Sequence, residues 1–294
     1  MIGIVDAHHH IWRQADLPWL QGPMVPRIFG PYEPIRRDYP IEEFLADIAG
    51  SGVGKSVYVQ TNWAKPQAVV EVEWVQGIAD RHGWPHGIVG YADLLCDDAR
   101  ETMKRQAAFP LMRGVRMQLH WHENEMYRFA ASPDLMNDAR LRKYIRVLAD
   151  HGWSFDLQVF TSQMADAARL AADNRDIVFV LQHAGMLEDL SPVGRQAWRE
   201  GMKRLAAEEN VVSKLSGLGT FIHRNYPAHV ADVVAETIAM FGSDRCLFGS
   251  NFPIEKLWTS YADLVAAHRA ALASYSREDQ EAVLRDTAIR VYRL

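Results

Sequence analysis

The stretch Ile2-Gly3-Ile4-Val5-Asp6-Ala7-His8-His9-His10 opens the chain and decides the fold. Its short apolar, β-branched beginning predicts a buried strand over residues 2–7. A dinucleotide-binding sheet would carry G-x-G-x-x-G directly after such a strand, and no such motif follows. Histidines follow instead, and polar residues at the end of a first strand are typical of a barrel with its site at that end.

Similar short runs recur along the whole chain. They cover residues 55–61, 86–92, 111–119, 154–160, 177–183, 211–216 and 245–250. Apolar residues at helical spacing predict helices between them, over 41–48, 66–78, 141–148, 230–241 and from Ser276 toward Tyr292. Eight strands alternating with helices predict a single domain, residues 1–294, with the fold of a distorted (β/α)8 TIM barrel. The alternative is an open, doubly wound sheet.

Composition excludes several classes of protein. The chain has 294 residues, of which 48% are hydrophobic and 23% charged, and its net charge is −5. That charge argues against nucleic acid and an anionic membrane surface as partners and leaves a small-molecule substrate. Two cysteines and the absence of a long apolar run or a signal peptide predict a cytoplasmic protein. Apolar residues near Tyr127 and Phe129 could pack within one chain or between chains, so a homo-oligomer is one of the expected states.

Residues 12–40 form an unusual connection after the first strand. The segment contains no clear helical or strand period, but it is rich in proline and in aromatic residues such as Trp12, Trp19 and Phe29. Loops longer than about 15 residues are usually functional lids or disordered linkers. The aromatic residues favour a packed lid over the barrel mouth, and a segment that merely seals this face is the alternative.

Three histidines are the leading candidates for chemistry. Alternate residues of a strand share a face, so His8 and His10 should point together and His9 away. His183 ends the sixth predicted strand and supplies a third imidazole. A lone histidine is usually structural, but three at one barrel mouth can bind a divalent metal such as zinc and leave one position open for water.

Other polar residues lie near the ends of predicted strands, at positions whose alternation places them on one face of each strand. Arg116 on the fourth predicted strand is costly to bury unless it meets an anionic or oxygen-rich ligand or a structural ion pair. Gln158 on the fifth strand and Lys214 on the seventh could hold substrate oxygens. Trp121 and Tyr226 follow strand ends and could form pocket walls, although such residues are also good packing residues.

Four motifs occur in the order of the strands. They are Asp6-Ala7-His8-His9-His10-Ile11-Trp12, Gln182-His183-Ala184-Gly185, Lys214-Leu215-Ser216-Gly217-Leu218 and Phe248-Gly249-Ser250-Asn251-Phe252-Pro253. Together they resemble the amidohydrolase superfamily, in particular its amidohydrolase-2 branch, which includes sugar-acid lactonases and 2-pyrone-4,6-dicarboxylate lactonase. The resemblance spans nearly the whole chain. It implies that His8, His10 and His183 bind a divalent cation, or act on the carbonyl without one as in some lactonases of this branch.

Asn251 departs from the family pattern. The eighth strand of the family usually ends in Asp, within Gly-Ser-Asp-Trp/Tyr-Pro, and that carboxylate takes the proton from the attacking water. An amide has no useful basicity, although its oxygen can position water or ligate a metal. The base could instead be His183, His122, Asp156 or Glu255.

The resemblance implies a hydrolase that opens a small polar lactone, from a sugar acid or an aromatic catabolite. Water would attack the ring carbonyl, with the catalytic set formed by His8, His10, His183 and Asn251. Arg116, Gln158, Lys214, Trp121 and Tyr226 would bind the substrate. Two alternatives follow from Asn251: a metal-dependent decarboxylase of the same branch, or a non-catalytic protein that binds a small molecule.

Overall fold

The computed structural model describes residues 2–294 and contains one eight-stranded parallel sheet. The strands are β1 (Ile4–His9), β2 (Val53–Val59), β3 (Gly87–Gly90), β4 (Met112–Val115), β5 (Ser154–Leu157), β6 (Phe179–Leu181), β7 (Val211–Leu215) and β8 (Cys246–Phe248). They pair in the order β1 to β8, as consecutive right-handed crossovers require. The predicted (β/α)8 barrel is therefore confirmed.

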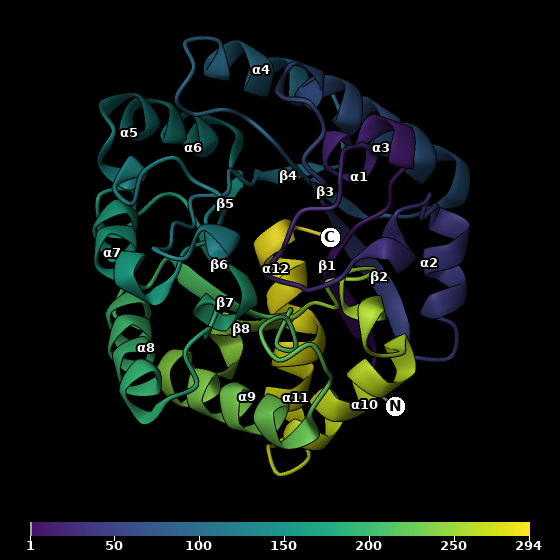
Figure 1. Ribbon diagram of the computed structural model, residues 1–294, viewed down its shortest axis with the longest axis vertical. Helices are drawn as coiled ribbons and strands as arrows, with labels where there is room; N and C mark the ends of the chain where they lie inside the picture. The colour runs from purple at the N-terminus through teal and green to yellow at the C-terminus, as the bar shows by residue number, and fades with distance from the viewer. Residues whose placement is uncertain (1) are drawn as a thin grey trace.

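The helices form a ring outside the strands (Figure 1). They are α2 (Ile41–Asp47), α3 (Ala68–His82), α4 (Ala99–Gln106), α5 (Ala139–Ile145), α6 (Val147–His151), α7 (Met164–Ala172), α8 (Pro192–Ala206), α9 (Pro227–Phe241), α10 (Tyr261–Ala271), α11 (Arg277–Glu281) and α12 (Thr287–Tyr292). The helix predicted over 141–148 is divided into α5 and α6 at Arg146. Ser276 caps α11 as expected, since its side chain accepts a hydrogen bond from the Asp279 backbone N–H.

The barrel closes between β1 and β8 less regularly than elsewhere. A single parallel bridge pairs His9 with Phe252, and the Asn251 backbone N–H donates to the His8 carbonyl at 2.7 Å. The side chain of Asp6 reinforces this seam. Its carboxylate accepts hydrogen bonds from the backbone N–H groups of His8 at 3.1 Å and Ser250 at 2.8 Å. The seam thus places the ends of both strands next to one another.

Helix α12 closes the N-terminal end of the barrel, and Figure 1 shows it running across the centre of the ring. Val291 and Tyr292 pack with interior residues such as Val5 and Val212 in one buried cluster. The Tyr292 hydroxyl donates to the Asp156 carboxylate inside the barrel at 3.0 Å. Because this end is filled, only the C-terminal end is left for a ligand.

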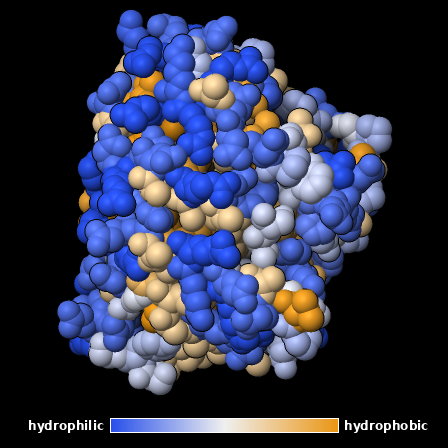
Figure 2. All heavy atoms as spheres, turned by 90° about the vertical axis from the view of Figure 1, so that its left-hand side faces the viewer, coloured by the Kyte–Doolittle hydropathy of each residue, from blue (hydrophilic) through white to orange (hydrophobic). Residues whose placement is uncertain are grey.

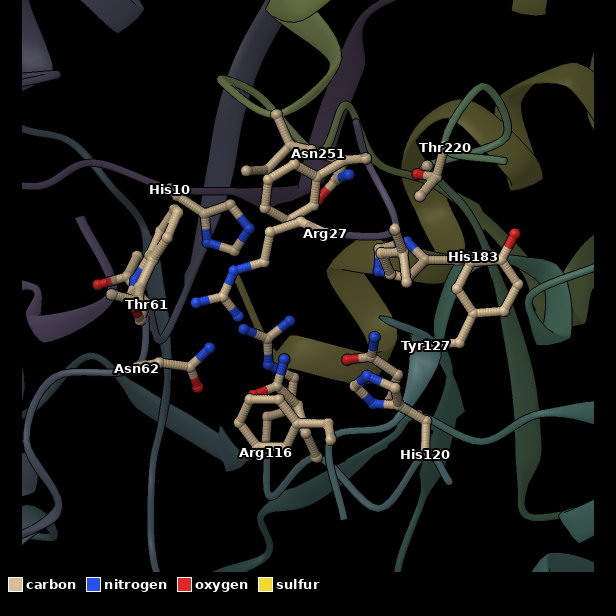
Figure 3. Close-up of a pocket in the computed structure, with 18 of the residues that line it drawn as sticks. His10, Arg27, Thr61, Asn62, Arg116, His120, Tyr127, His183, Thr220 and Asn251 are labelled. Atoms are coloured by element: carbon tan, nitrogen blue, oxygen red, sulfur yellow. The ribbon is translucent and has the colours of Figure 1, made fainter. Parts of the chain in front are cut away.

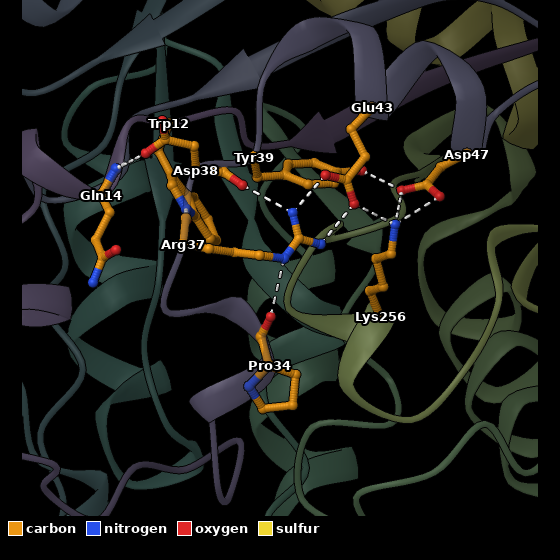
Figure 4. Close-up of polar contacts among 9 residues, drawn as sticks. All are labelled: Trp12, Gln14, Pro34, Arg37, Asp38, Tyr39, Glu43, Asp47 and Lys256. Atoms are coloured by element: carbon orange, nitrogen blue, oxygen red, sulfur yellow. Dashed lines mark hydrogen bonds and ion pairs between the residues drawn. The ribbon is translucent and has the colours of Figure 1, made fainter.

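The predicted lid, residues 12–40, is packed rather than extended and contains the short helix α1 (Pro18–Gln21). An antiparallel bridge between Trp12 and Tyr39 joins its two ends. Figure 4 shows the ion cluster that fixes the second end. Arg37 donates to Glu43 of α2 at 2.5 and 2.7 Å, and Lys256, beyond β8, pairs with the same carboxylate at 2.8 Å. These contacts hold the lid against the barrel.

The outer surface shown in Figure 2 is mostly hydrophilic, with apolar groups scattered over it. Such isolated apolar residues are normal on a protein surface. Among residues 2–294, no helix combines the length and the apolar character needed to span a membrane.

Candidate active site

A cavity of about 430 Å³ opens at the C-terminal end of the barrel, beneath the lid. Its polar wall includes His10, Arg27, Thr61, Asn62, Arg116, Gln118, His120, Gln158, His183, Thr220 and Asn251. Figure 3 shows many of these side chains pointing into the same space. Strand ends and the lid therefore build the site together.

The first-strand histidines alternate as the sequence predicts. The rings of His8 and His10 lie 5.0 Å apart, and His183 lies 4.9 Å from His8, measured between ring centroids. His9 points the other way: it stacks on Phe44 of α2 at 3.8 Å and hydrogen-bonds the Ser56 hydroxyl at 3.0 Å. The structure thus brings three imidazoles together and separates the fourth.

The surroundings of His10 fix which ring nitrogen faces the cavity. Its Nδ1 lies 2.7 Å from the Val59 carbonyl, which can only accept, so Nδ1 carries the proton. Burial, and after it the charge of Arg116, lower the pKa of His10 to about 3. The ring is therefore neutral at pH 7 and Nε2 keeps its lone pair.

His183 is held in a sparsely populated backbone conformation, with φ at 54°. Such angles in a non-glycine residue are typical of functional sites that the surrounding structure over-determines. Its Nδ1 meets the Ser216 hydroxyl at 2.9 Å, and its pKa is also lowered to about 3, first by burial and then by Arg116. Gly217 makes room for the ring, because a Cβ there would lie 2.6 Å from Nδ1.

The three imidazoles match a metal site in kind but not in arrangement. Both ring nitrogens of His8 are buried with no hydrogen-bond partner in the described chain, a state that a ligand would relieve. The Nδ1 contacts of His10 and His183 resemble the outer contacts of metal-binding histidines. Within residues 2–294, however, no three His, Cys, Asp or Glu side chains are placed so that they could hold a metal ion. The metal centre thus stays a prediction.

Asn251 follows β8 and lines the cavity beside the histidines. Directly behind it lies Glu255, buried and absent from the described cavity wall. Glu255 accepts hydrogen bonds from Trp258 Nε1 at 2.8 Å and from the Thr220 hydroxyl at 3.4 Å. Burial nevertheless raises the pKa of its carboxyl to about 8, so at pH 7 the group is mostly protonated.

The predicted substrate-binding residues divide into two groups. Arg116 and Gln158 line the cavity, as expected from their parity. Trp121, Tyr226 and Lys214 are not part of the described cavity wall. Tyr226 is 47% exposed, and Arg128 covers the Trp121 ring at 5.0 Å.

Lys214 is fully buried below the cavity. Its ammonium group pairs with Asp156 at 2.8 Å, and burial lowers its pKa while Asp156 opposes that change. Two of the alternative bases are thereby placed away from the cavity. Asp156 is committed to Lys214 and Tyr292, and His122 lies 3.8 Å from Glu188 outside the described cavity wall.

The sequence analysis missed two prominent side chains of the cavity. His120 continues the alternation of Arg116 and Gln118 beyond β4, so the parity argument could have found it. Its Nδ1 is buried without a partner in the described structure. Arg27 lies in the lid, where no period indicates the direction of a side chain.

Comparison with known proteins identifies relatives of the chain. A protein of Sinorhizobium fredii, the uncharacterised y4mH, is 35% identical over 100% of this chain and 99% of its own length. An L-fucono-1,5-lactonase of Burkholderia multivorans is 27% identical over 99% of this chain and 96% of its own. A crystal structure of a Burkholderia multivorans amidohydrolase with bound zinc is 25% identical, with a TM-score of 0.83 over 99% of both chains. The amidohydrolase family model matches residues 5–294, and the protein is therefore an enzyme that belongs to the amidohydrolase family.

Proposed function

We propose that the protein hydrolyses a small, polar lactone. The observation that carries this proposal is the pair of neutral imidazoles, His10 and His183, at one end of a cavity large enough for a sugar-sized ring. The L-fucono-1,5-lactonase relatives support the same reaction class. The proposal specifies the class of substrate, a lactone with a polar ring.

The reaction can be written with groups of this chain. His10 Nε2 accepts a proton from a water molecule that the Asn251 amide orients, and the water oxygen attacks the lactone carbonyl. His183, with Nδ1 accepting from Ser216, donates its Nε2 proton toward the developing oxyanion. The ring C–O bond then breaks, and the proton held by His10 passes to the departing ring oxygen. Asn251 thus needs no basicity.

A divalent metal, with zinc as the candidate, is the alternative to this proton transfer, because an imidazole nitrogen that binds a metal cannot also accept or donate a proton. Zinc is bound in a solved relative that covers 99% of this chain, and His8, His10 and His183 would hold the ion here. Bound there, it would polarise the carbonyl as a Lewis acid. Metal analysis of the purified protein, with activity measured before and after chelation, tests this alternative.

The test of hydrolysis is acid release from a panel of aldono- and aromatic lactones, followed with a pH indicator. We expect His10→Asn and His183→Asn to lower kcat by about 10²–10⁴-fold while the proteins stay folded. His9→Asn is the matched control, because this ring faces away from the cavity. Near-normal turnover in folded His10 and His183 variants would contradict the proposal.

If no lactone of the panel released acid, two further measurements would distinguish the alternative functions. Release of carbon dioxide from aromatic acids would then identify a decarboxylase. Thermal stabilisation by a lactone without any product would identify a binding protein.

A further inference from the structure

The described wall of the cavity contains positively charged side chains and no acidic ones. Of its described lining residues none is Asp or Glu, whereas Arg27, Lys65, Arg116 and Arg128 all contribute to the wall. Lys65 is neutralised by Asp93 at 2.6 Å, and Arg128 donates to the carbonyls of loop residues 122 and 123. Arg27 and Arg116 are left as the two cations that face the cavity.

Arg116 enters from the end of β4 and is buried to 4% exposure. Its Nη2 donates to the Gln60 carbonyl at 2.5 Å, but its Nε has no hydrogen-bond partner in the described structure. Burial lowers its pKa to about 10, so the guanidinium remains charged at pH 7. Asp156 and Glu71 oppose this change by attracting the charge, but among the described residues neither forms an ion pair with Arg116, so an anionic ligand would stabilise the guanidinium further.

Arg27 enters from the lid, and its own Nε is likewise buried without a partner in residues 2–294. The segment around it is fixed on both sides. The Gly30 N–H closes a turn onto the Arg27 carbonyl at 2.9 Å, and His223 Nε2 meets the Ile28 carbonyl at 3.0 Å. The guanidinium lies over the Trp19 ring at 5.7 Å. Arg27 is therefore held in place before any ligand arrives.

Both guanidinium groups point toward one another across the cavity in Figure 3. Two like charges repel, so an arrangement that directs them to the same space is stabilised by an anion between them. A guanidinium offers N–H donors in a planar fork that matches the two oxygens of a carboxylate. A neutral sugar ring would supply no negative charge to the space between the two guanidinium groups.

We propose that the ligand of this cavity carries a carboxylate, which binds between Arg27 of the lid and Arg116 of β4. The proposal rests on the proposed function for the lactone ring and adds the substrate class: a carboxylated lactone rather than a neutral one. Arg27 is accordingly a residue that determines specificity.

The experiment uses two lactones that differ only at one terminal group. D-glucaro-1,4-lactone carries a carboxylate where D-glucono-1,4-lactone carries a hydroxymethyl group. Binding of each to the full-length protein is measured by calorimetry at pH 7, and acid release is measured in parallel. The variants are Arg27→Gln and Arg27→Lys, with Arg13→Gln as control, since Arg13 also lies in the lid but pairs with Asp16 and is not part of the described cavity wall.

We expect the wild-type protein to bind the carboxylated lactone at least about tenfold more tightly than the neutral one. Arg27→Gln should remove most of this preference, Arg27→Lys should keep part of it, and Arg13→Gln should keep all of it. Equal binding of the two lactones, no binding of either, or a preference unaffected by Arg27→Gln, overturns the proposal.

The two readouts separate this inference from the proposed function. Acid release without a carboxylate preference would retain the hydrolase and reject the carboxylate site. An Arg27-dependent preference without acid release from either lactone would retain the carboxylate site and count against the hydrolase.

Discussion

At the scale of single residues, Glu255 is a sensitive point because a carboxyl group is buried directly behind the site. Its pKa is raised from 4.5 to about 8, so the folded protein binds more protons than the unfolded chain between these values. The contribution of this group to stability is complete below about pH 4.5 and is lost as the pH rises through about 8.

We therefore predict that Glu255→Gln makes stability less dependent on pH. An amide can still accept from Trp258 Nε1 but cannot ionise. Between pH 6 and pH 9 the wild-type free energy of unfolding should fall, relative to the variant, by on the order of 2 kcal/mol. Urea unfolding at both pH values measures this, with the exposed Glu278→Gln as control. Parallel pH profiles for wild type and Glu255→Gln would refute the prediction.

The sequence predicted which side of a strand a side chain occupies better than it predicted how deep in the barrel that side chain lies. Alternation placed His8 and His10 together and His9 apart, as the structure shows. The same rule put Lys214 toward the interior but could not tell that it lies below the cavity, paired with Asp156. Arg27 was missed because a loop has no period. Its guanidinium lies over Trp19, and the neighbouring Ile28 carbonyl is held by His223, which is distant in the sequence.

At the scale of elements, the seam between β1 and β8 depends on the side chain of Asp6. Besides the backbone N–H groups of His8 and Ser250, it accepts a hydrogen bond from the Tyr261 hydroxyl of α10 at 2.9 Å. The carboxylate therefore joins two strands and a helix at the point where the histidine motif begins.

We predict that Asp6→Ala destabilises the fold by about 3 kcal/mol or more, because it leaves buried donors on both strands unsatisfied. Tyr261→Phe removes one of the same hydrogen bonds and should cost about 1 kcal/mol. Urea unfolding at pH 7 compares the two variants with the wild type. A smaller loss for Asp6→Ala than for Tyr261→Phe would show that Asp6 does not hold the seam.

Strands were located correctly from short apolar runs, but the end of the first was placed too early, before His9, and the ends of the other seven were placed too late. The run over 177–183 predicted a strand up to His183, whereas β6 ends at Leu181. Beyond it His183 and Ala184 adopt positive φ angles, at 54° and 47°. Local hydrophobicity cannot reveal this turn, since the contact of His183 with Ser216 that accompanies it comes from another strand.

At the scale of the whole molecule, the alternation of strands and helices was sufficient to predict the barrel, since eight parallel strands, each joined to the next by a crossover, close a sheet. The closing of its N-terminal end by α12 was not predicted. That helix is amphipathic like the others, and only the barrel interior decides which end it covers. The filled end in turn concentrates polar and titratable groups at the opposite one.

This concentration predicts how the molecule responds to acid. Burial lowers the pKa of His8, His9, His10, His120 and His183 below the ordinary value of 6.5. An unfolded chain takes up protons at these positions as the pH falls below 6.5, whereas the folded protein does not. Their stabilising contribution is therefore present above pH 6.5 and is lost progressively below it.

We expect the free energy of unfolding to fall from pH 6.5 to 5.5 by more than about 1.4 kcal/mol, the amount for one proton per pH unit. Glu255 acts in the opposite direction in this window, so Glu255→Gln should make the fall steeper, while His120→Gln, which removes one buried imidazole at the cavity wall, should reduce it. Urea unfolding at several pH values gives the slopes. A flat profile between these pH values would mean that the imidazoles take up protons in the folded protein as readily as in the unfolded chain, which would contradict the lowering of their pKa values by burial.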